Sequence, residues 1–202
     1  GVKINLEFIS ANPTGPLHLG HTRWAAVGDA LARVLIAGGA KVAREFYIND
    51  RGNQMDLFGA SLAASALGQA KPEDGYQGQY IDELAQEILV KKPEYRELSG
   101  QSAIEAFREA GYELQLAQQK KVLVNFGTRF DIWFSERSLH SGDGIDKALA
   151  TLKSQGHTYE DEGAIWLRTT DFGDDKDRVM IKSGGELTYF SSDTAYYQDK
   201  RR

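Results

Sequence analysis

Two strand patterns enclose one helix pattern near the start of the chain, and this order restricts the folds open to it. Residues 2–9, "VKINLEFI", alternate apolar side chains on one face, which is typical of a strand. Residues 19–37 carry apolar side chains at helical spacing, and Gly38 and Gly39 follow as a left-handed stop. Residues 41–48, "KVAREFYI", form a second strand pattern. A strand, a helix and a strand at this distance predict a βαβ unit with parallel strands.

A mainly helical stretch then interrupts the sheet pattern. Helix patterns cover residues 54–67, 80–92 and 102–129, with a turn-rich loop at 71–80. The later sequence predicts a strand at 129–136, a helix at 142–156 ended by Gly156, and short strands at 157–163, 164–170, 177–182 and 187–192, with a hairpin turn at Gly184 and Gly185. We therefore expect an α/β protein with a parallel sheet, a helical insertion and a small antiparallel β segment.

The composition restricts the environment and the partners of the chain. Its 202 residues contain no cysteine, which excludes disulfides and cysteine-bound metals and fits a reducing cytoplasm. No apolar run reaches the roughly 18 residues of a membrane span, so we expect no membrane contact. The net charge of -5 argues against a surface that coats nucleic acid. The chain opens within a strand pattern and stops within a helix pattern, so we expect a piece of a longer protein.

The stretch "SANPTGPLHLGHTR", residues 10–23, lies at the first strand-to-helix junction. The carboxyl edge of a parallel sheet is where doubly wound folds bind nucleotides, and a helix N-terminus favours phosphate. His18 and His21 can add donors there, and Gly20 lets a flat base or ribose approach the backbone. These features predict ATP binding, with the histidines stabilising charge on a phosphate.

Other interpretations of these residues are weaker. His18 and His21 could ligate a metal, but no third ligand is close in sequence, so we expect no protein metal site. They could simply be polar residues at a helix start, which the flanking prolines and glycines make less favoured. "DFG" at 171–173 is interpreted as a turn, and the acidic run of Asp174, Asp175 and Asp177 as a solvated turn.

Several motifs carry a family resemblance. "ANPTGPLHLGH" resembles the His-x-Gly-His signature of class I aminoacyl-tRNA synthetases. The chain is similar to arginyl-tRNA synthetases in particular through "EFISANPTGPLHLGHTR", "YINDRGNQ", "FDIWFSE", "YEDEGAIWLRTTDFGDDKDRVMIKS" and "TYFSSDTAYY". The resemblance implies a truncated, partial Rossmann-like catalytic domain over 1–202, divided into a first βαβ at 1–52, a mainly helical insertion at 53–129 and a return to the sheet at 130–202.

The resemblance also implies roles for single residues. His18 and His21 would be catalytic, and His18, Gly20 and His21 would bind ATP. A carboxylate such as Glu7, at the end of its strand, can take a guanidinium as a bidentate pair. Asp193 follows Tyr189 by four positions, one turn if that segment is helical. The implied arginine-binding residues are Glu7, Ser10, Ala11, Asn12, His21, Tyr189 and Asp193.

The activity implied is that of an arginine–tRNA ligase in protein synthesis. With ATP and Mg²⁺, such an enzyme activates L-arginine to arginyl-adenylate and transfers the arginyl group to tRNA-Arg. The resemblance implies a cytoplasmic monomer that contacts tRNA mainly through domains absent from this chain, and that needs bound tRNA for activation. The family's second, lysine-rich signature loop is missing, since "KSGGE" at 182–186 is predicted to be a hairpin turn. We therefore expect the chain alone to be inactive.

Two alternatives stay open from the sequence. A nucleotidylyltransferase shares the His-x-Gly-His junction, although such compact enzymes do not need the helical insertion. A non-catalytic binding module derived from a synthetase would retain the motifs without the second loop.

Overall fold

The computed structural model of the protein describes residues 1–201, and these form two units. The first unit comprises Gly1–Ser135, and the second contains the described residues from Glu136 onward. Each unit has its own sheet, and each is described separately below.

The first unit contains a parallel three-stranded sheet in the order β1-β2-β3. Its strands are β1 (Lys3–Glu7), β2 (Lys41–Ile48) and β3 (Ile132–Ser135). Glu7 of β1 stands opposite Glu45 of β2, which in turn stands opposite Ile132 of β3. All three strands end at the same edge of the sheet. The prediction of parallel strands is therefore confirmed.

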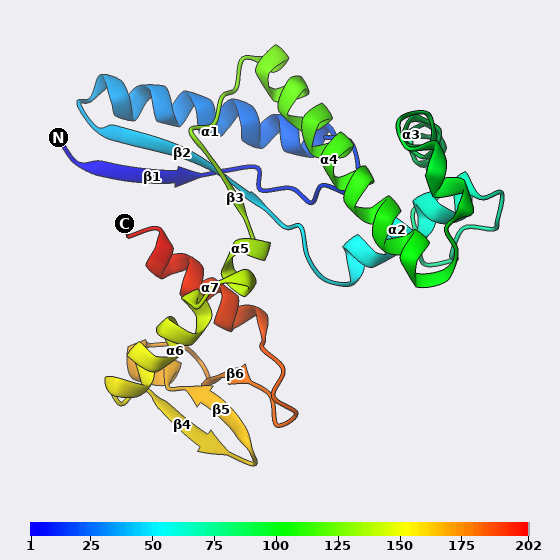
Figure 1. Ribbon diagram of the computed structural model, residues 1–202. Helices are drawn as coiled ribbons and strands as arrows, with labels where there is room; N and C mark the ends of the chain where they lie inside the picture. Colours follow the sequence, from blue (N-terminus) through cyan, green and yellow to red (C-terminus); the bar gives the residue numbers. More distant parts are fainter. Residues whose placement is uncertain (202) are drawn as a thin grey trace. The chain divides into compact units, whose positions relative to one another are not determined.

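Helix α1 (Leu19–Ala37) connects β1 to β2 and runs beside both strands (Figure 1). Its observed bounds coincide with the predicted ones. Gly39 adopts a φ of 89°, the left-handed conformation expected just after a helix end. The βαβ unit predicted from the first 48 residues is confirmed.

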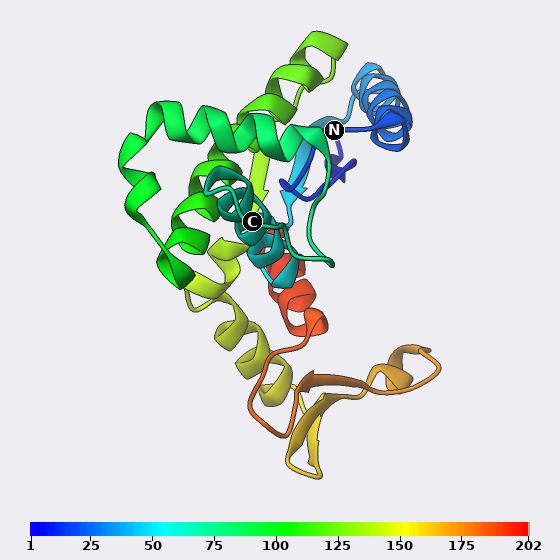
Figure 2. The same ribbon diagram turned by 90° about the vertical axis from the view of Figure 1, so that its right-hand side faces the viewer.

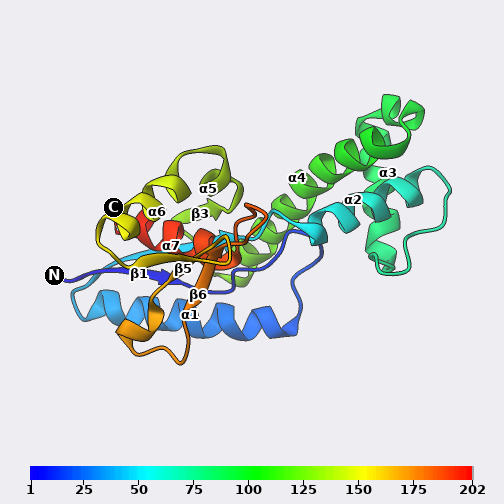
Figure 3. The ribbon, with the colours of Figure 1, turned by 90° about the horizontal axis from the view of Figure 1, so that it is seen from below.

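A helical block lies between β2 and β3 in the sequence. It consists of α2 (Asn53–Ala66), α3 (Gln79–Lys91), the short 3₁₀ helix η1 (Pro93–Glu97) and α4 (Gly100–Phe126). Helices α2, α3 and α4 pack on one another, and α4 reaches from this block back to the sheet (Figure 3). Their common core buries Met55, Phe58, Leu62, Ala63, Ile81, Leu84, Ala85, Ile88, Leu89, Ala103 and Phe107.

Helix α4 belongs to two cores at once. Phe107 near its start lies in the helical core, whereas Leu123 near its end packs with Phe46 and Ile48 of β2. Every fourth residue between them is buried, which gives the line Ala103, Phe107, Gly111, Gln115, Gln119 and Leu123. Two buried amides thus occupy the middle of a line that is otherwise made of apolar residues and one glycine.

The second unit pairs a small antiparallel sheet with three helices (Figure 2). Its elements are α5 (Arg137–Ser141), α6 (Gly144–Ser154), β4 (Thr158–Asp161), β5 (Ala164–Leu167), the 3₁₀ helix η2 (Thr169–Phe172), β6 (Arg178–Ile181) and α7 (Tyr189–Asp199). Helices α6 and α7 pack together, and Gly156 ends the α6 segment with a φ of 78°. The α/β class with a small antiparallel segment is confirmed. The "DFG" turn falls in η2 and Gly173, between β5 and β6.

The predicted strand at 187–192 is wrong. Leu187 makes one isolated bridge to Ile181, and α7 begins at Tyr189. The prediction followed the β-forming residues of "LTYF", but the polar side chains decide the conformation. The Thr188 hydroxyl donates to the carbonyl of Val179 at 2.6 Å, and the Ser191 hydroxyl donates to that of Met180. Both bonds tie the helix start to β6.

The predicted turn at "KSGGE" is confirmed, although it joins β6 to the isolated bridge at Leu187 and not to a second strand. The Lys182 amide donates to the Glu186 carbonyl at 2.9 Å, and the Gly185 amide donates to the Lys182 carbonyl at 2.8 Å. Among residues 1–201, no helix combines the length and apolar character needed to span a bilayer.

Helices α2 and α4 approach closely at Gly59, and we predict that a methyl group there destabilises the first unit. A Cβ on Gly59 would lie 2.6 Å from the Ile104 carbonyl oxygen and 2.6 Å from Arg108 Cβ. The backbone of α4 would have to move, so Gly59→Ala should lower the free energy of unfolding by about 1–3 kcal/mol. Urea unfolding measures this change.

The control is Gly144→Ala, at the first position of α6. No atom lies within 4 Å of a Cβ there, so its stability should stay unchanged or rise. Equal destabilisation by both variants would contradict the close approach of α2 and α4.

Candidate functional site

The chain leaves β1 through a strained turn. Ile9 and Ser10 have φ angles of 71° and 48°, in the left-handed region that branched side chains rarely enter. The Ser10 amide donates to the Phe8 carbonyl at 3.0 Å and closes the turn. Such backbone costs on the order of 1–3 kcal/mol per residue and persists only where its surroundings enforce it. Strained backbone of this kind is concentrated at functional sites.

Ser10 connects the end of β1 to the end of β2. Its hydroxyl donates to Glu7 Oε1 at 2.8 Å and accepts from the Tyr47 amide at 3.2 Å. The carboxylate of Glu7 is therefore held in one orientation at the carboxyl edge of the sheet, where its residue is exposed. Ser10 thus orients an acid, and it does so from an unusual backbone conformation.

A buried acid lies at the same edge, one strand further along the sheet. Asp50 lies two residues after the end of β2 and is fully buried. Ser135, the last residue of β3, donates its hydroxyl proton to Asp50 Oδ2 at 2.6 Å. The carboxyl ends of β2 and β3 are thereby fixed to each other. Asp50 was not predicted as a site residue, although an acid two residues after a strand of a parallel sheet lies at the edge where such sites form.

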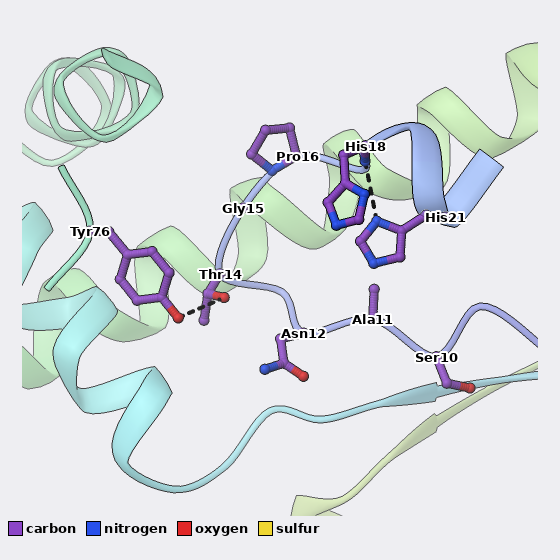
Figure 4. Close-up of a pocket in the computed structure, with 9 residues that line it drawn as sticks. All are labelled: Ser10, Ala11, Asn12, Thr14, Gly15, Pro16, His18, His21 and Tyr76. Carbon is purple, nitrogen blue, oxygen red and sulfur yellow. Dashed lines mark hydrogen bonds between the residues drawn. The ribbon is translucent and has the colours of Figure 1, made fainter. Parts of the chain in front are cut away.

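A hollow of about 380 Å³ opens beside the junction (Figure 4). The rings of His18 and His21 lie side by side at one end of it, and the Tyr76 ring stands at the other. The residues that line it are Ser10, Ala11, Asn12, Thr14, Gly15, Pro16, His18, His21 and Tyr76. Most of them come from the junction stretch, and Tyr76 comes from the loop before α3.

The two histidines cap α1 reciprocally. His18 Nδ1 accepts from the Gly20 amide at 3.1 Å, and His21 Nδ1 accepts from the His18 amide at 3.2 Å. A ring whose Nδ1 accepts a hydrogen bond carries its proton on Nε2. The pair therefore offers two Nε2–H donors to a ligand. A Cβ at Gly20 would lie 3.0 Å from the His18 ring, so the lack of a side chain at position 20 leaves room for that ring.

The environment of His21 favours its neutral form. Burial lowers the pKa of His21, and the neighbouring His18 lowers it further. The ring centroids of the two histidines lie 3.9 Å apart, so a charge on both rings would be repulsive. A neutral His21 ring thus stands beside the His18 ring at the positive end of α1.

Helix α4 fixes the backbone of the loop that joins β1 to α1 (the junction loop, residues 8–18). Gln119 Nε2 donates to the Asn12 carbonyl at 3.0 Å and to the Gly15 carbonyl at 2.8 Å. On α2, Gln54 Oε1 accepts from the Asn12 side-chain amide. Residues from two insertion helices therefore hold the loop at its two ends.

Two tyrosines hold the middle of the same loop. The Tyr80 hydroxyl donates to the Thr14 carbonyl at 2.9 Å, and the Tyr76 hydroxyl donates to Thr14 Oγ1 at 3.1 Å. Burial, and to a lesser degree Tyr76, raises the pKa of Tyr80 to about 12. The Tyr80 hydroxyl therefore stays protonated and remains a donor at neutral pH. Sequence reasoning missed these partners because each lies more than 60 residues from the loop.

The second unit carries the two other predicted site residues. Tyr189 is the first residue of α7 and is 83% exposed, and Asp193 lies one turn later, also exposed. Residues four apart in a helix share a face. The structure therefore brings this phenol and this carboxylate onto one exposed helix face.

The structure thus gathers the predicted residues into two groups. The first unit joins Glu7 to Ser10 and places Ala11, Asn12, His18 and His21 around the hollow, with Gly20 in the first turn of α1. The second unit aligns Tyr189 with Asp193. Within residues 1–201, no cluster of three His, Cys, Asp or Glu side chains could hold a metal ion.

Comparisons with known proteins identify the family of the chain. Residues 2–202 match the family model described as tRNA synthetases class I (R), catalytic domain. The chain is 55% identical over 201 residues to an arginine–tRNA ligase of Paenarthrobacter aurescens. This match covers 100% of the chain and 37% of that protein. It is 52% identical to an arginine–tRNA ligase of Micrococcus luteus, over 100% of the chain and 36% of that protein.

Solved structures give the same result. The chain matches an arginyl-tRNA synthetase structure from Campylobacter jejuni with a TM-score of 0.91 and 37% identity, over 100% of the chain and 45% of that structure. It matches the Thermus thermophilus arginyl-tRNA synthetase with a TM-score of 0.71 and 27% identity, over 98% of the chain and 35% of that structure. The chain thus spans little more than a third of the length of the relatives that it matches in sequence.

We predict that the pKa of His21 lies below 6.5 and that His18→Asn raises it only in part, because burial is the larger cause. Asparagine keeps an acceptor at the helix N-cap and removes the neighbouring ring. Because the pKa of His21 is lowered, the folded protein binds fewer protons than the unfolded chain just below pH 6.5. The contribution of His21 should therefore make the free energy of unfolding fall as the pH drops through that range. A proton NMR titration of the histidine rings measures the midpoint, and a value at or above 6.5 for His21 would contradict this.

Proposed function

The chain belongs to the catalytic-domain family of the class I tRNA synthetases for arginine, and from this premise we propose that the full-length protein is an arginine–tRNA ligase. It activates L-arginine with ATP and transfers the arginyl group to tRNA-Arg. The observation that carries the proposal is the hollow beside α1, which is lined by the capping histidines His18 and His21 and by Ser10, whose hydroxyl orients the Glu7 carboxylate. The family match does not favour the nucleotidylyltransferase or the binding module considered above.

We propose that the carboxyl edge of the first sheet takes the arginine. Glu7 is held by Ser10, and a carboxylate fixed in this way suits a planar guanidinium with five donors. Ala11, Asn12 and His21 complete this group. A lysine ammonium is a point charge that pairs poorly with such an acid, which supports selectivity for arginine. On α7, Tyr189 and Asp193 share one exposed helix face and carry a phenol and a carboxylate, groups that can also pair with a guanidinium.

We propose that the histidine end of the hollow takes ATP. Gly20 leaves space at the first turn of α1, and the helix N-terminus favours phosphate. In the first step, an oxygen of the arginine carboxylate forms a bond to the α-phosphorus, and the bond from that phosphorus to the bridging oxygen breaks. Arginyl-adenylate and pyrophosphate result. The Nε2–H groups of His18 and His21 donate to phosphate oxygens as charge develops on them.

In the second step, the 2′-hydroxyl of the terminal adenosine of the tRNA attacks the carbonyl carbon of the adenylate. The ester to the tRNA forms, and AMP leaves. Mg²⁺ fits this proposal as an ion carried by the triphosphate, because magnesium in such sites is bound largely by substrate phosphates and water. When bound, it would neutralise phosphate charge. We further propose a cytoplasmic monomer whose tRNA contacts lie mainly outside this chain.

The role of His18 is tested by His18→Asn in the full-length protein. Asparagine retains the N-cap acceptor but lacks the Nε2–H donor, so the fold should remain while the rate of adenylate formation falls about 100-fold. Arginine-dependent ATP–pyrophosphate exchange, measured with tRNA-Arg present, gives this rate. A wild-type rate in the variant would remove His18 from the mechanism.

The role of Glu7 is tested by Glu7→Gln. Loss of the charge should raise the KM for arginine at least 10-fold, because a charge-assisted bidentate pair becomes a neutral contact. Glu94→Gln on the exposed η1 helix is the matched control and should leave the KM unchanged. Equal KM values for Glu7→Gln and the wild type would show that Glu7 does not bind the guanidinium.

A further inference from the structure

Resting on the proposed function, we propose that Gln119 of α4 is a positioning residue for adenylate formation. It lies outside the signature stretch and does not line the hollow. It acts through the backbone of the loop that forms the hollow, and it keeps that loop in the shape that receives the substrates. The helical insertion would thereby contribute directly to the reaction.

The contacts of Gln119 concern a single loop. Both hydrogens of its amide nitrogen are used, one for the Asn12 carbonyl at 3.0 Å and one for the Gly15 carbonyl at 2.8 Å. These carbonyls stand on either side of Pro13 and Thr14. The side chain therefore spans the loop and fixes the distance between its two ends. Asn12 and Gly15 themselves line the hollow, so any shift of the loop changes its shape.

The side chain of Gln119 is buried, and the hydrogen bonds that it makes within the described residues go to this loop. The residue is 2% exposed, and its Oε1 has no hydrogen-bond partner within residues 1–201. A buried amide oxygen without a partner is unfavourable, and a methionine of similar size would avoid that cost. The donated bonds to the loop are the one gain that glutamine provides over an apolar residue at this position.

Gln115, one turn earlier on the same buried line of α4, is a natural control. It is 1% exposed, and neither its amide nitrogen nor its amide oxygen has a partner within the described residues. It shares the helix, the burial and the chemistry of Gln119, but within residues 1–201 its side chain makes no hydrogen bond to the junction loop. The difference between the two residues is therefore the pair of bonds to Asn12 and Gly15.

The expected effect follows from geometry. Substrate atoms that are misplaced by about 1 Å at a reacting centre can cost roughly 100-fold in rate. Without Gln119, Tyr80 and Tyr76 still hold Thr14, so the loop should loosen at its ends and not detach. We therefore expect a loss of about 10- to 100-fold in kcat for adenylate formation, together with a smaller rise in the KM for arginine.

The experiment compares Gln119→Met with Gln115→Met in the full-length protein. ATP–pyrophosphate exchange with tRNA-Arg present gives kcat and KM, and thermal unfolding gives stability. Amide hydrogen exchange over residues 11–18 reports the order of the loop. The expected result is that Gln119→Met alone loses kcat and loop protection, while Gln115→Met keeps both at wild-type values. A wild-type kcat and wild-type loop protection in Gln119→Met would overturn the proposal.

A second variant, Gln119→Glu, keeps the shape of the side chain. Two carboxylate oxygens facing the carbonyls of Asn12 and Gly15 would be repulsive, whereas a protonated carboxyl regains one donor. The ratio of variant to wild-type kcat should therefore rise as the pH is lowered from 8 to 6.5. A ratio that does not change with pH would count against the donor role.

The two proposals fail in different ways. If the wild-type protein shows no arginine-dependent ATP–pyrophosphate exchange, the proposed function is wrong. Amide hydrogen exchange over residues 11–18 still decides whether Gln119 orders the loop. If exchange is present and both methionine variants behave alike, the positioning role of Gln119 is wrong and the proposed function stands.

Discussion

The structure depends on one requirement: the backbone groups that leave the sheet after β1 need hydrogen-bond partners. A loop that runs away from a sheet loses the ladder that satisfied it, and buried groups without partners are costly. Here the carbonyls of Asn12, Thr14 and Gly15 receive donors from Gln119 and Tyr80. All of these donors come from the helical insertion. The insertion is therefore what allows a proline- and glycine-rich loop to hold a defined hollow beside the sheet.

The histidine pair shows how structure and proposed chemistry share the same rings. The Nδ1 atoms of His18 and His21 serve the cap of α1, and this use directs the remaining nitrogen of each ring toward possible ligands. A cap made of aspartate would satisfy the helix equally well but would leave no such donor. The lowered pKa of His21 fits this division, because a proton on its Nδ1 would remove an acceptor that the cap uses.

Local patterns predicted local structure. The bounds of α1 and β2 followed from strong apolar periods and from the two glycines between them. The site residues between positions 7 and 21 could be predicted for the same reason, since they lie within one short stretch of the sequence. Three residues that hold the site were missed, because no local pattern encodes contacts between distant residues. Their partners lie 66 residues away for Tyr80, 85 for Asp50 and up to 107 for Gln119. The error at 187–192 arose because tertiary bonds from Thr188 and Ser191 outweighed the β propensity of their neighbours.

The sequence separation between Gln119 and its loop has a consequence for the order of folding. Asn12 and Gly15 lie 107 and 104 residues before the side chain that satisfies them. Contacts of such long range form late, since the closure of a long loop must be offset by packing. The βαβ unit at the start of the chain can form before the loop that lines the hollow has adopted its final conformation. The ability to bind substrate would then arise only after α4 has docked, so a partly folded chain would not bind substrate.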